Sequence, residues 1–280
     1  MNLRSCRTLG LKVAGLTALV LGPVRALSQE IGGVLDRPLD ISRDGHMIDF
    51  ILDKTILLVS IWFAVVLVAL IWFIIRYRQR EGHRRGHYFH GQNLPAIILQ
   101  IAVGLLVFLT IDLQLDRLSM EHLEKTYYRY PPLEEALRVE IMPQQWAWNI
   151  RYAGPDDRFN TADDAVTLND LRVPSGKPAI IQLKAKDVIH SLFLPNVRLK
   201  QDAIPGRVTQ FWFEPVKTGR FEMVCAEHCG LNHYKMRGDF IVLEPDEFEL
   251  WLKEAQRLSE IAFDPQDEDA LWGWEWEERR

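Results

Sequence analysis

An uncharged apolar run constrains the fold of this chain more than any other feature. The segment from Thr55 to Ile75, TILLVSIWFAVVLVALIWFII, contains no charged residue. As a helix rising ~1.5 Å per residue, it is long enough to cross the ~30 Å hydrocarbon layer of a bilayer. Two buried helices of a soluble protein are the less favoured interpretation, because such runs are rare in globular cores. The sequence therefore predicts a membrane-spanning helix.

A second apolar run completes a helical hairpin. Residues 94–111, LPAIILQIAVGLLVFLTI, are just long enough to span, and Pro95 lies in the first turn, where proline is tolerated. The loop between the runs has one acid, Glu81, and five arginines: Arg76, Arg78, Arg80, Arg84 and Arg85. The positive-inside rule places this loop in the cytoplasm. We expect a transmembrane hairpin in contact with lipid over residues 55–113, after an external segment over residues 29–54.

The N-terminus has the pattern of a secretory signal peptide. Scattered basic residues precede the apolar stretch VAGLTALVLGPV and the small-residue site ALS. We expect residues 1–28 to be removed together with Cys6, which leaves Cys225 and Cys229 as the cysteines of the mature chain. The net charge of -5 gives no indication of a nucleic-acid partner.

Short alternating runs over residues 137–245 predict an antiparallel β-sandwich. The polar segment YAGPDDRFNTADDAVTLND interrupts it. The acids of this segment lack EF-hand spacing, which favours a solvated hairpin loop over a calcium site; they are Asp156, Asp157, Asp163 and Asp164. Residues 246–280 predict one amphipathic helix and an acidic, tryptophan-rich tail. That tail is either a partner-binding segment or an incompletely ordered terminus.

The segment VCAEHCGLNHYKM, residues 224–236, concentrates soft donor atoms. A cysteine pair in an exported protein is most simply a disulfide, so the neighbouring residues must decide. Thiolate, thioether and imidazole groups together favour copper or zinc. His190, at the end of the run KDVIH, could reach the same loop in a sandwich.

Met236 favours copper over zinc. A structural zinc site would be satisfied by two cysteines and two histidines and would not need a methionine. A blue-copper site has one cysteine, whereas two cysteines allow their thiolates to bridge two copper ions. The residues therefore predict a binuclear copper centre.

The motif CAEHCGLNHYKM, preceded by IHSLFLPNVRLKQDAIPGR and QQWAW, resembles the copper A domain of cytochrome c oxidase subunit II. The resemblance extends from the first span to about Pro245. It implies a two-helix transmembrane hairpin followed by an all-β cupredoxin-like Greek-key sandwich. It also implies a bacterial inner-membrane subunit of a proton-translocating oxidase, with its copper domain on the periplasmic side. Electrons would pass from cytochrome c through this subunit to haem in subunit I, where oxygen is reduced to water.

The resemblance also implies a set of ligands. Cys225 and Cys229 would bridge the coppers, His190 and His233 would each bind one, and Met236 would be a weak ligand of one of them. The backbone carbonyl of Glu227 would be the weak ligand of the other copper. The carboxylate of Glu227 would bind a magnesium ion shared with subunit I, although a plain solvated acid is the alternative. His228 is expected to be a non-ligand.

Electron entry and donor docking are implied for three further residues. Trp146 resembles the tryptophan through which electrons enter, although an aromatic strand residue alone is more often part of a core. Trp148 would share its face in a regular strand, and Ala147 replaces the tyrosine usual in the family. Asp187 would lie near the donor-docking face and Asp202 near subunit I, whereas Lys186 stands where the family often has an acid.

Two alternatives remain open from the sequence. A copper A-containing nitric oxide reductase would share the ligands, and a tethered periplasmic copper carrier would bind the metal without catalysis. A quinol oxidase subunit is disfavoured because it lacks these ligands. In the cytoplasmic loop, Tyr88 stands where the family often has a glutamate at a proton entrance, and His83, His87 and His90 could relay protons there instead.

Overall fold

The computed structural model describes residues 37–82, 90–161 and 163–262. The predicted signal peptide, Cys6, His83, His87, Tyr88 and the tryptophan-rich tail lie outside these residues.

Two long apolar helical segments precede the head of the protein. Helix α2 (Gly45–Tyr77) contains the first apolar run and begins before it. The second segment, Leu94–Tyr128, is divided into α3 (Leu94–Val107), η1 (Phe108–Asp112), α4 (Leu113–His122) and η2 (Leu123–Tyr128). Asn93 caps its start, because its side chain accepts a hydrogen bond from the Ala96 amide. Both segments are long and apolar enough to cross a membrane, and their most apolar parts are not buried within the protein.

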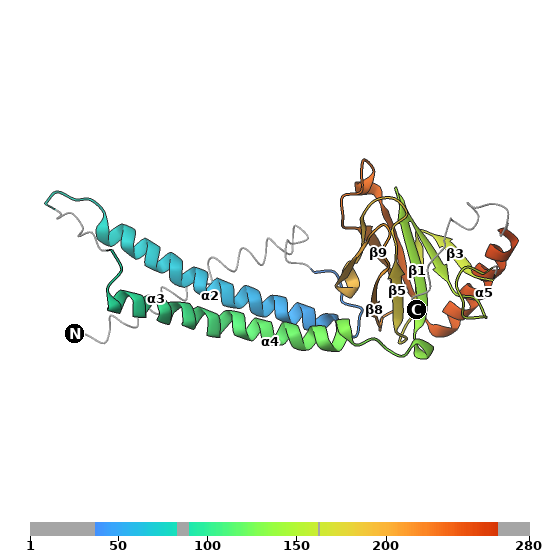
Figure 1. Cartoon of the computed structure of the whole chain (residues 1–280), viewed down its shortest axis with the longest axis horizontal. Helices are drawn as coiled ribbons and strands as arrows, with labels where there is room; N and C mark the ends of the chain where they lie inside the picture. The colour runs from blue at the N-terminus through green and yellow to red at the C-terminus, as the bar shows by residue number, and fades with distance from the viewer. Residues whose placement is uncertain (1–36, 83–89, 162, 263–280) are drawn as a thin grey trace. The chain divides into compact units, whose positions relative to one another are not determined.

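The head is a sandwich of two five-stranded sheets (Figure 1). One sheet has the order β3-β2-β1-β5-β8, with β1 (Leu137–Gln144), β2 (Ala147–Tyr152), β3 (Ala165–Leu168), β5 (Ala179–Leu183) and β8 (Thr209–Phe213). The other has the order β4-β10-β9-β6-β7, with β4 (Asp170–Pro174), β6 (His190–Leu194), β7 (Leu199–Ala203), β9 (Gly219–Cys225) and β10 (Arg237–Leu243). The predicted fold class, two helices followed by a β-sandwich, is confirmed.

The strand pairing is mixed, and this corrects the expectation of an antiparallel sandwich. Strand β1 pairs in parallel with β5, and β10 pairs in parallel with β4. Parallel neighbours cannot be joined by a tight hairpin. The chain satisfies this requirement because it moves between the two sheets before it returns beside an earlier strand.

The core lies between the two sheets and extends beneath helix α5 (Pro245–Ala262). Side chains from both sheets are buried together, among them Ile141, Ile181, Leu192 and Phe240. The amphipathic α5 packs against β3 and β4, and Trp251 lies edge-on to the ring of Tyr152 at 5.3 Å (Figure 1). Helix α5 therefore covers the β3 edge of its sheet, which would otherwise expose unpaired backbone groups.

The N-terminal segment also enters this core. Ile41 is fully buried there, and its backbone bonds to Asn196 and Val216 on either side. The segment was expected only to be external. These contacts of Ile41 hold the segment that directly precedes α2 against the sandwich.

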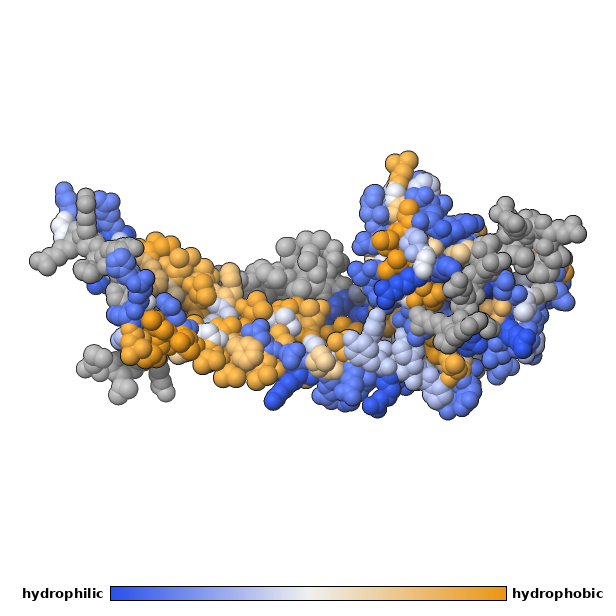
Figure 2. Space-filling view, in the orientation of Figure 1, coloured by the Kyte–Doolittle hydropathy of each residue, from blue (hydrophilic) through white to orange (hydrophobic). Residues whose placement is uncertain are grey.

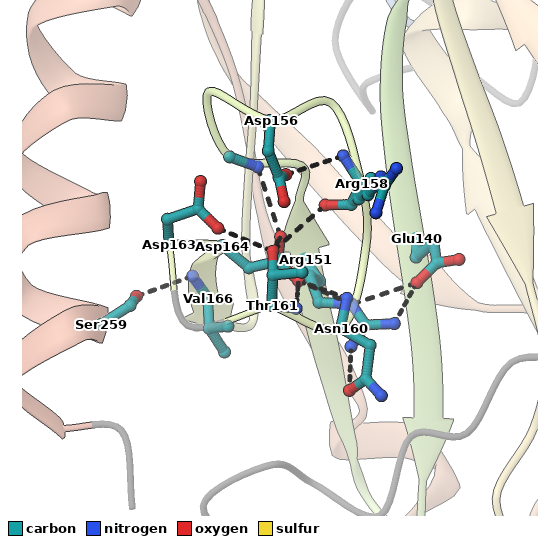
Figure 3. Close-up of polar contacts among 11 residues, drawn as sticks. Glu140, Arg151, Asp156, Arg158, Asn160, Thr161, Asp163, Asp164, Val166 and Ser259 are labelled. Atoms are coloured by element: carbon teal, nitrogen blue, oxygen red, sulfur yellow. Dashed lines mark hydrogen bonds and ion pairs between the residues drawn. The ribbon is translucent and has the colours of Figure 1, made fainter. Parts of the chain in front are cut away.

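The polar insertion between β2 and β3 packs around three buried charged side chains, Glu140, Arg151 and Asp164 (Figure 3). The Asp164 carboxylate accepts hydrogen bonds from the backbone amides of Gly154, Asn160 and Thr161. It also lies 3.6 Å from Arg151, which pairs with Glu140. The loop is therefore held together by the buried carboxylate of Asp164, and the expected solvated hairpin is wrong for this acid.

Candidate metal centre

The connection between β9 and β10, residues 226–236, is a closed loop. The Cys225 amide donates to the Met236 carbonyl at 3.1 Å, so the two ends of the loop are joined. Gly230 has φ +115°, and a Cβ there would lie 2.8 Å from Gln145 Nε2. Only glycine combines that backbone angle with such a close approach.

This loop brings the soft donor atoms together. The Sγ atoms of Cys225 and Cys229 are 3.8 Å apart, and Cys229 Sγ lies 3.6 Å from His233 Nδ1 and 3.7 Å from Met236 Sδ. The carbonyl oxygen of Glu227 is 3.2 Å from Cys225 Sγ. The short loop fixes all five groups because they are at most eleven residues apart in sequence.

His190 reaches the same site from another part of the chain. It begins β6, which pairs with β9 so that Leu192 lies opposite Cys225. Its Nδ1 atom is 4.0 Å from Cys225 Sγ, and its ring is fully buried 6.4 Å from that of Trp148. On the other side of the ring, Nε2 lies 2.8 Å from Asp187 Oδ1. Among the described residues, His190, Cys225 and Cys229 form a group whose ligand atoms all lie within 4.8 Å of one another.

The donor atoms fit a soft metal centre. Metal–sulfur bonds of ~2.3 Å and metal–nitrogen bonds of ~2.0 Å place two donors on one tetrahedral ion about 3.5–3.8 Å apart. The separations between the two thiols, and between the thiols and the imidazoles, lie close to that range. The thiols are free, and 3.8 Å is far longer than a disulfide of ~2.05 Å. Met236 is buried against Cys229, which favours copper over zinc.

The two thiols are electrostatically unequal. Burial raises the pKa of Cys225, but hydrogen bonds with His190 and the Ser191 amide outweigh it and lower that pKa to about 6. Burial, together with the charge of Cys225, raises the pKa of Cys229 to about 12. At neutral pH the metal-free site therefore holds one thiolate and one thiol. Metal binding would release the second proton, because both sulfurs must be deprotonated to act as ligands.

Comparison with known proteins gives the family. The model of the cytochrome c oxidase subunit II periplasmic domain matches residues 137–244. An alternative cytochrome c oxidase subunit 2 from Bradyrhizobium diazoefficiens is 28% identical over 256 residues, which cover 79% of this chain and 85% of the relative. A crystal structure of the periplasmic domain of cytochrome oxidase subunit II from Bradyrhizobium japonicum is 30% identical. The match covers 46% of this chain and 99% of that domain, with a TM-score of 0.41.

Residues 137–244 therefore belong to the cytochrome c oxidase subunit II family, and the chain is similar to a member of that family over most of its length. It is thus a membrane-anchored subunit of a haem-copper oxidase with a periplasmic copper A domain, and the predicted family is confirmed. A second crystal structure contains subunit II of a cytochrome c oxidase in a mixed disulfide with a thioredoxin-like protein. It is 31% identical over 46% of this chain and 97% of that one, with a TM-score of 0.39.

Trp146 contacts the loop of residues 226–236, which we call the metal loop, and it does not lie in a strand. Residues 145–146 form the turn between β1 and β2, so the run QQWAW is not one regular strand as expected. The Trp146 indole Nε1 donates to the Cys229 carbonyl at 3.2 Å, and Gln145 Nε2 donates to the same oxygen at 2.7 Å. Trp148 is fully buried in β2, whereas Trp146 remains partly exposed.

The acids assigned by resemblance differ in their hydrogen bonds and in their exposure to solvent. The Asp187 carboxylate accepts from the backbone amides of Gln145 and Val188 as well as facing His190. Asp202 accepts from the Ser191 hydroxyl at 2.7 Å. Glu227 and His228 are both exposed in the loop. Sequence patterns missed the contact of Asp187 with His190, although a carboxylate three residues before a ligand histidine was a signal for it.

Proposed function

We propose that the head of this subunit holds a binuclear copper A centre that receives electrons from cytochrome c. The arrangement of the donors carries this proposal: two thiols lie 3.8 Å apart, with one histidine nitrogen beside each sulfur. Cys225 and Cys229 would bridge the ions, His190 and His233 would each bind one, and Met236 and the Glu227 carbonyl would be weak ligands. A bound copper pair supplies one-electron redox chemistry.

The protein contributes a rigid, largely dry enclosure for this centre. Cys229, Met236 and His190 are almost fully buried. Asp187 orients the His190 ring from behind, and the bond between Cys225 and Met236 closes the loop. Ligands held in this way change position little between redox states, which favours fast electron transfer.

Electrons would enter at Trp146. Its indole is partly exposed and donates a hydrogen bond to the carbonyl of Cys229, so it links the surface to a bridging residue. From the head, electrons would pass to haem in subunit I, where oxygen is reduced to water and the complex translocates protons. The exposed carboxylate of Glu227 would bind a magnesium ion at the interface with subunit I.

The cysteine pair must stay reduced to accept copper. The sulfurs are close enough that a small rearrangement would bring them to bonding distance. A thioredoxin-like protein forms a mixed disulfide with the solved relative. We extend that interaction to this chain, where such a reductant would keep Cys225 and Cys229 as thiols before copper is inserted.

We further propose that this centre lies at the bacterial inner membrane. Residues 1–28 would be a cleaved signal peptide. The arginine-rich loop between the two helical spans would face the cytoplasm, which places the head in the periplasm.

A metal inventory of the purified complex tests the function. We expect two coppers for each subunit II, together with haem from subunit I and turnover of oxygen by reduced cytochrome c. One tightly bound zinc without copper would contradict the site. A chain that purifies without haem and exchanges copper readily would be a carrier, and turnover of nitric oxide without oxygen turnover would identify a nitric oxide reductase.

A further inference from the structure

The metal centre is closed on the side that faces the core. His190, Cys229 and Met236 are at most 2% exposed and lie on this side. The turn between β1 and β2 covers the centre further, because the side chains of Gln145 and Trp146 both donate to the Cys229 carbonyl. A metal ion could reach the sulfurs from these directions only by displacing buried side chains.

The outer side of the metal loop is open to solvent. His228 is exposed there, and Cys225 and His233 are partly exposed. In Figure 1 and Figure 2 the loop protrudes at one end of the sandwich. An ion that comes from solvent must therefore arrive on the side of these three residues.

His228 lies where an arriving ion would pass. It directly precedes Cys229, and its ring centre is 5.5 Å from that of His233. Two nitrogens bound to one ion at ~2.0 Å each can be up to ~4 Å apart. The ring positions allow this separation, because the nitrogens lie at the edges of the rings. The two imidazoles are therefore spaced to hold one ion between them, and imidazole is a common copper ligand.

The same pair leads inward to a bridging sulfur. His233 Nδ1 lies 3.6 Å from Cys229 Sγ, so an ion on His233 is already next to that sulfur. An ion held by the two histidines therefore needs to exchange only one ligand to enter the centre.

Packing does not account for the position of His228. Its ring is exposed, so it contributes little buried surface. Within the part of the chain that the structure describes, its side chain makes no hydrogen bond and no ion pair. His190 differs, because Asp187 holds its Nε2 atom. The imidazole of His228 is thus available to bind a metal.

We propose that His228 is an entry ligand for copper, which together with His233 binds a cuprous ion at the surface and passes it to Cys229. This inference rests on the copper centre proposed above. In the transfer, the bond from copper to His228 breaks, a bond to the Cys229 sulfur forms, and the thiol proton passes to solvent. The ion stays cuprous, His233 remains a ligand throughout, and His228 is not a ligand of the finished centre.

Anaerobic copper uptake by the full-length, metal-free chain in detergent tests this role. The probe is cuprous ion supplied as its coloured bicinchoninate complex, and the loss of colour gives the rate. The rate is taken where it rises in proportion to the chain concentration, so that release from the chelator does not limit it. His228→Phe keeps a ring beside His233 but has no donor atom. We expect this variant to take up copper about tenfold more slowly, because a group that supports the metal site is lost.

The finished centre should be unaffected by this change. After loading and one-electron oxidation, His228→Phe should have the copper content and the mixed-valence spectrum of the native chain. His228→Met supplies another soft donor and should restore most of the uptake rate. His46→Phe changes another exposed histidine, in the first turn of α2, and should leave the rate unchanged.

The entry site can also be measured without the thiols. In a chain that carries Cys225→Ser and Cys229→Ser, we expect one weakly bound cuprous ion, with nitrogen ligands in its X-ray absorption spectrum. Adding His228→Phe should lower the affinity for that ion by about tenfold or more.

The contrary results are distinct. Equal uptake rates for the native chain and His228→Phe, or a His228→Met variant as slow as His228→Phe, would overturn the entry role. Loss of the mixed-valence spectrum in a fully loaded His228→Phe chain would overturn it as well, because His228 would then belong to the finished centre. If the native chain itself takes up no copper, the copper function proposed above fails, and this inference fails with it.

Discussion

Asp187 Oδ1 lies 2.8 Å from His190 Nε2, on the side of the ring opposite Cys225. The carboxylate is itself fixed by the amides of Gln145 and Val188. Burial raises the pKa of Asp187, but these hydrogen bonds, led by that of His190, outweigh it and lower the pKa below its usual value. Asp187 therefore stays ionised and selects the tautomer in which His190 Nδ1 is free to bind a metal.

Replacement of Asp187 by asparagine should weaken copper binding. The amide can preserve the shape of the side chain, but it removes the charge that orients His190 and makes it a better donor. We expect copper affinity to fall by roughly 10- to 100-fold, measured by competition with a copper chelator. Asp239→Asn, which removes only an exposed pair with Arg220, is the control. Equal affinities for the two variants would show that Asp187 does not support the ligand.

Replacement of Cys229 by serine should destroy the binuclear centre. Cys229 Sγ contacts Cys225, His233 and Met236, so its loss removes the sulfur that the other donors share. We expect loss of the mixed-valence copper spectrum and at most one copper for each chain, measured by electron paramagnetic resonance and metal analysis. A retained mixed-valence signal would rule out a bridging role for this residue.

Replacement of Trp146 by leucine should slow electron entry and leave the centre intact. The change removes the indole that links the surface to the Cys229 carbonyl, whereas Gln145 still holds that carbonyl. We expect an unchanged copper spectrum and a rate of reduction by cytochrome c lowered by at least about tenfold, a rise of ~1.4 kcal/mol in activation free energy. Trp146→Phe should restore part of the rate. Full activity of the leucine variant would show that electrons use another route.

The metal loop was predictable from sequence because its chemistry is local. Five of the six donor groups lie between Cys225 and Met236, so no knowledge of the fold was needed to group them. His190 could be proposed as a further ligand because it ends the run KDVIH, which was expected to be a strand; in the structure His190 instead begins β6. Its position beside Cys225 depends on the pairing of β6 with β9, which periodicity alone does not specify.

The features that were missed depend on tertiary contacts. Glu140 and Arg151 alternate with apolar residues as solvent-facing strand residues do, yet the insertion covers them. Ile41 lies in a short segment with no periodic pattern, and it is buried only because the sandwich accepts it. Trp146 was placed in a strand because aromatic residues favour strands, whereas the chain turns there between β1 and β2.

The buried charges beneath the insertion predict a pH dependence of stability. Glu140, Arg151 and Asp164 have side chains that are only 3–4% exposed, so two carboxylates share one guanidinium (Figure 3). Burial raises the pKa of both acids, and Arg151 offsets this only in part. Between the unfolded and folded pKa values, the folded chain binds more protons than the unfolded chain. The contribution of each acid to stability is therefore fully present at low pH and is lost as the pH rises through its folded pKa.

Glu140→Gln should remove part of this dependence. Glutamine still offers an oxygen to Arg151 but cannot ionise, so the melting temperature of the variant relative to the native chain should rise as the pH increases from about 4.5 to 7. Each ~1 kcal/mol would appear as roughly 4–8 °C in a domain of ~100 residues. Near-ultraviolet circular dichroism of the full-length chain in detergent provides the measurement, with Glu249→Gln on the exposed face of α5 as the control. If the variant instead loses stability relative to the native chain as the pH rises, Arg151 must lower the folded pKa of Glu140 below its unfolded value, and the ion pair would outweigh the burial of its charge.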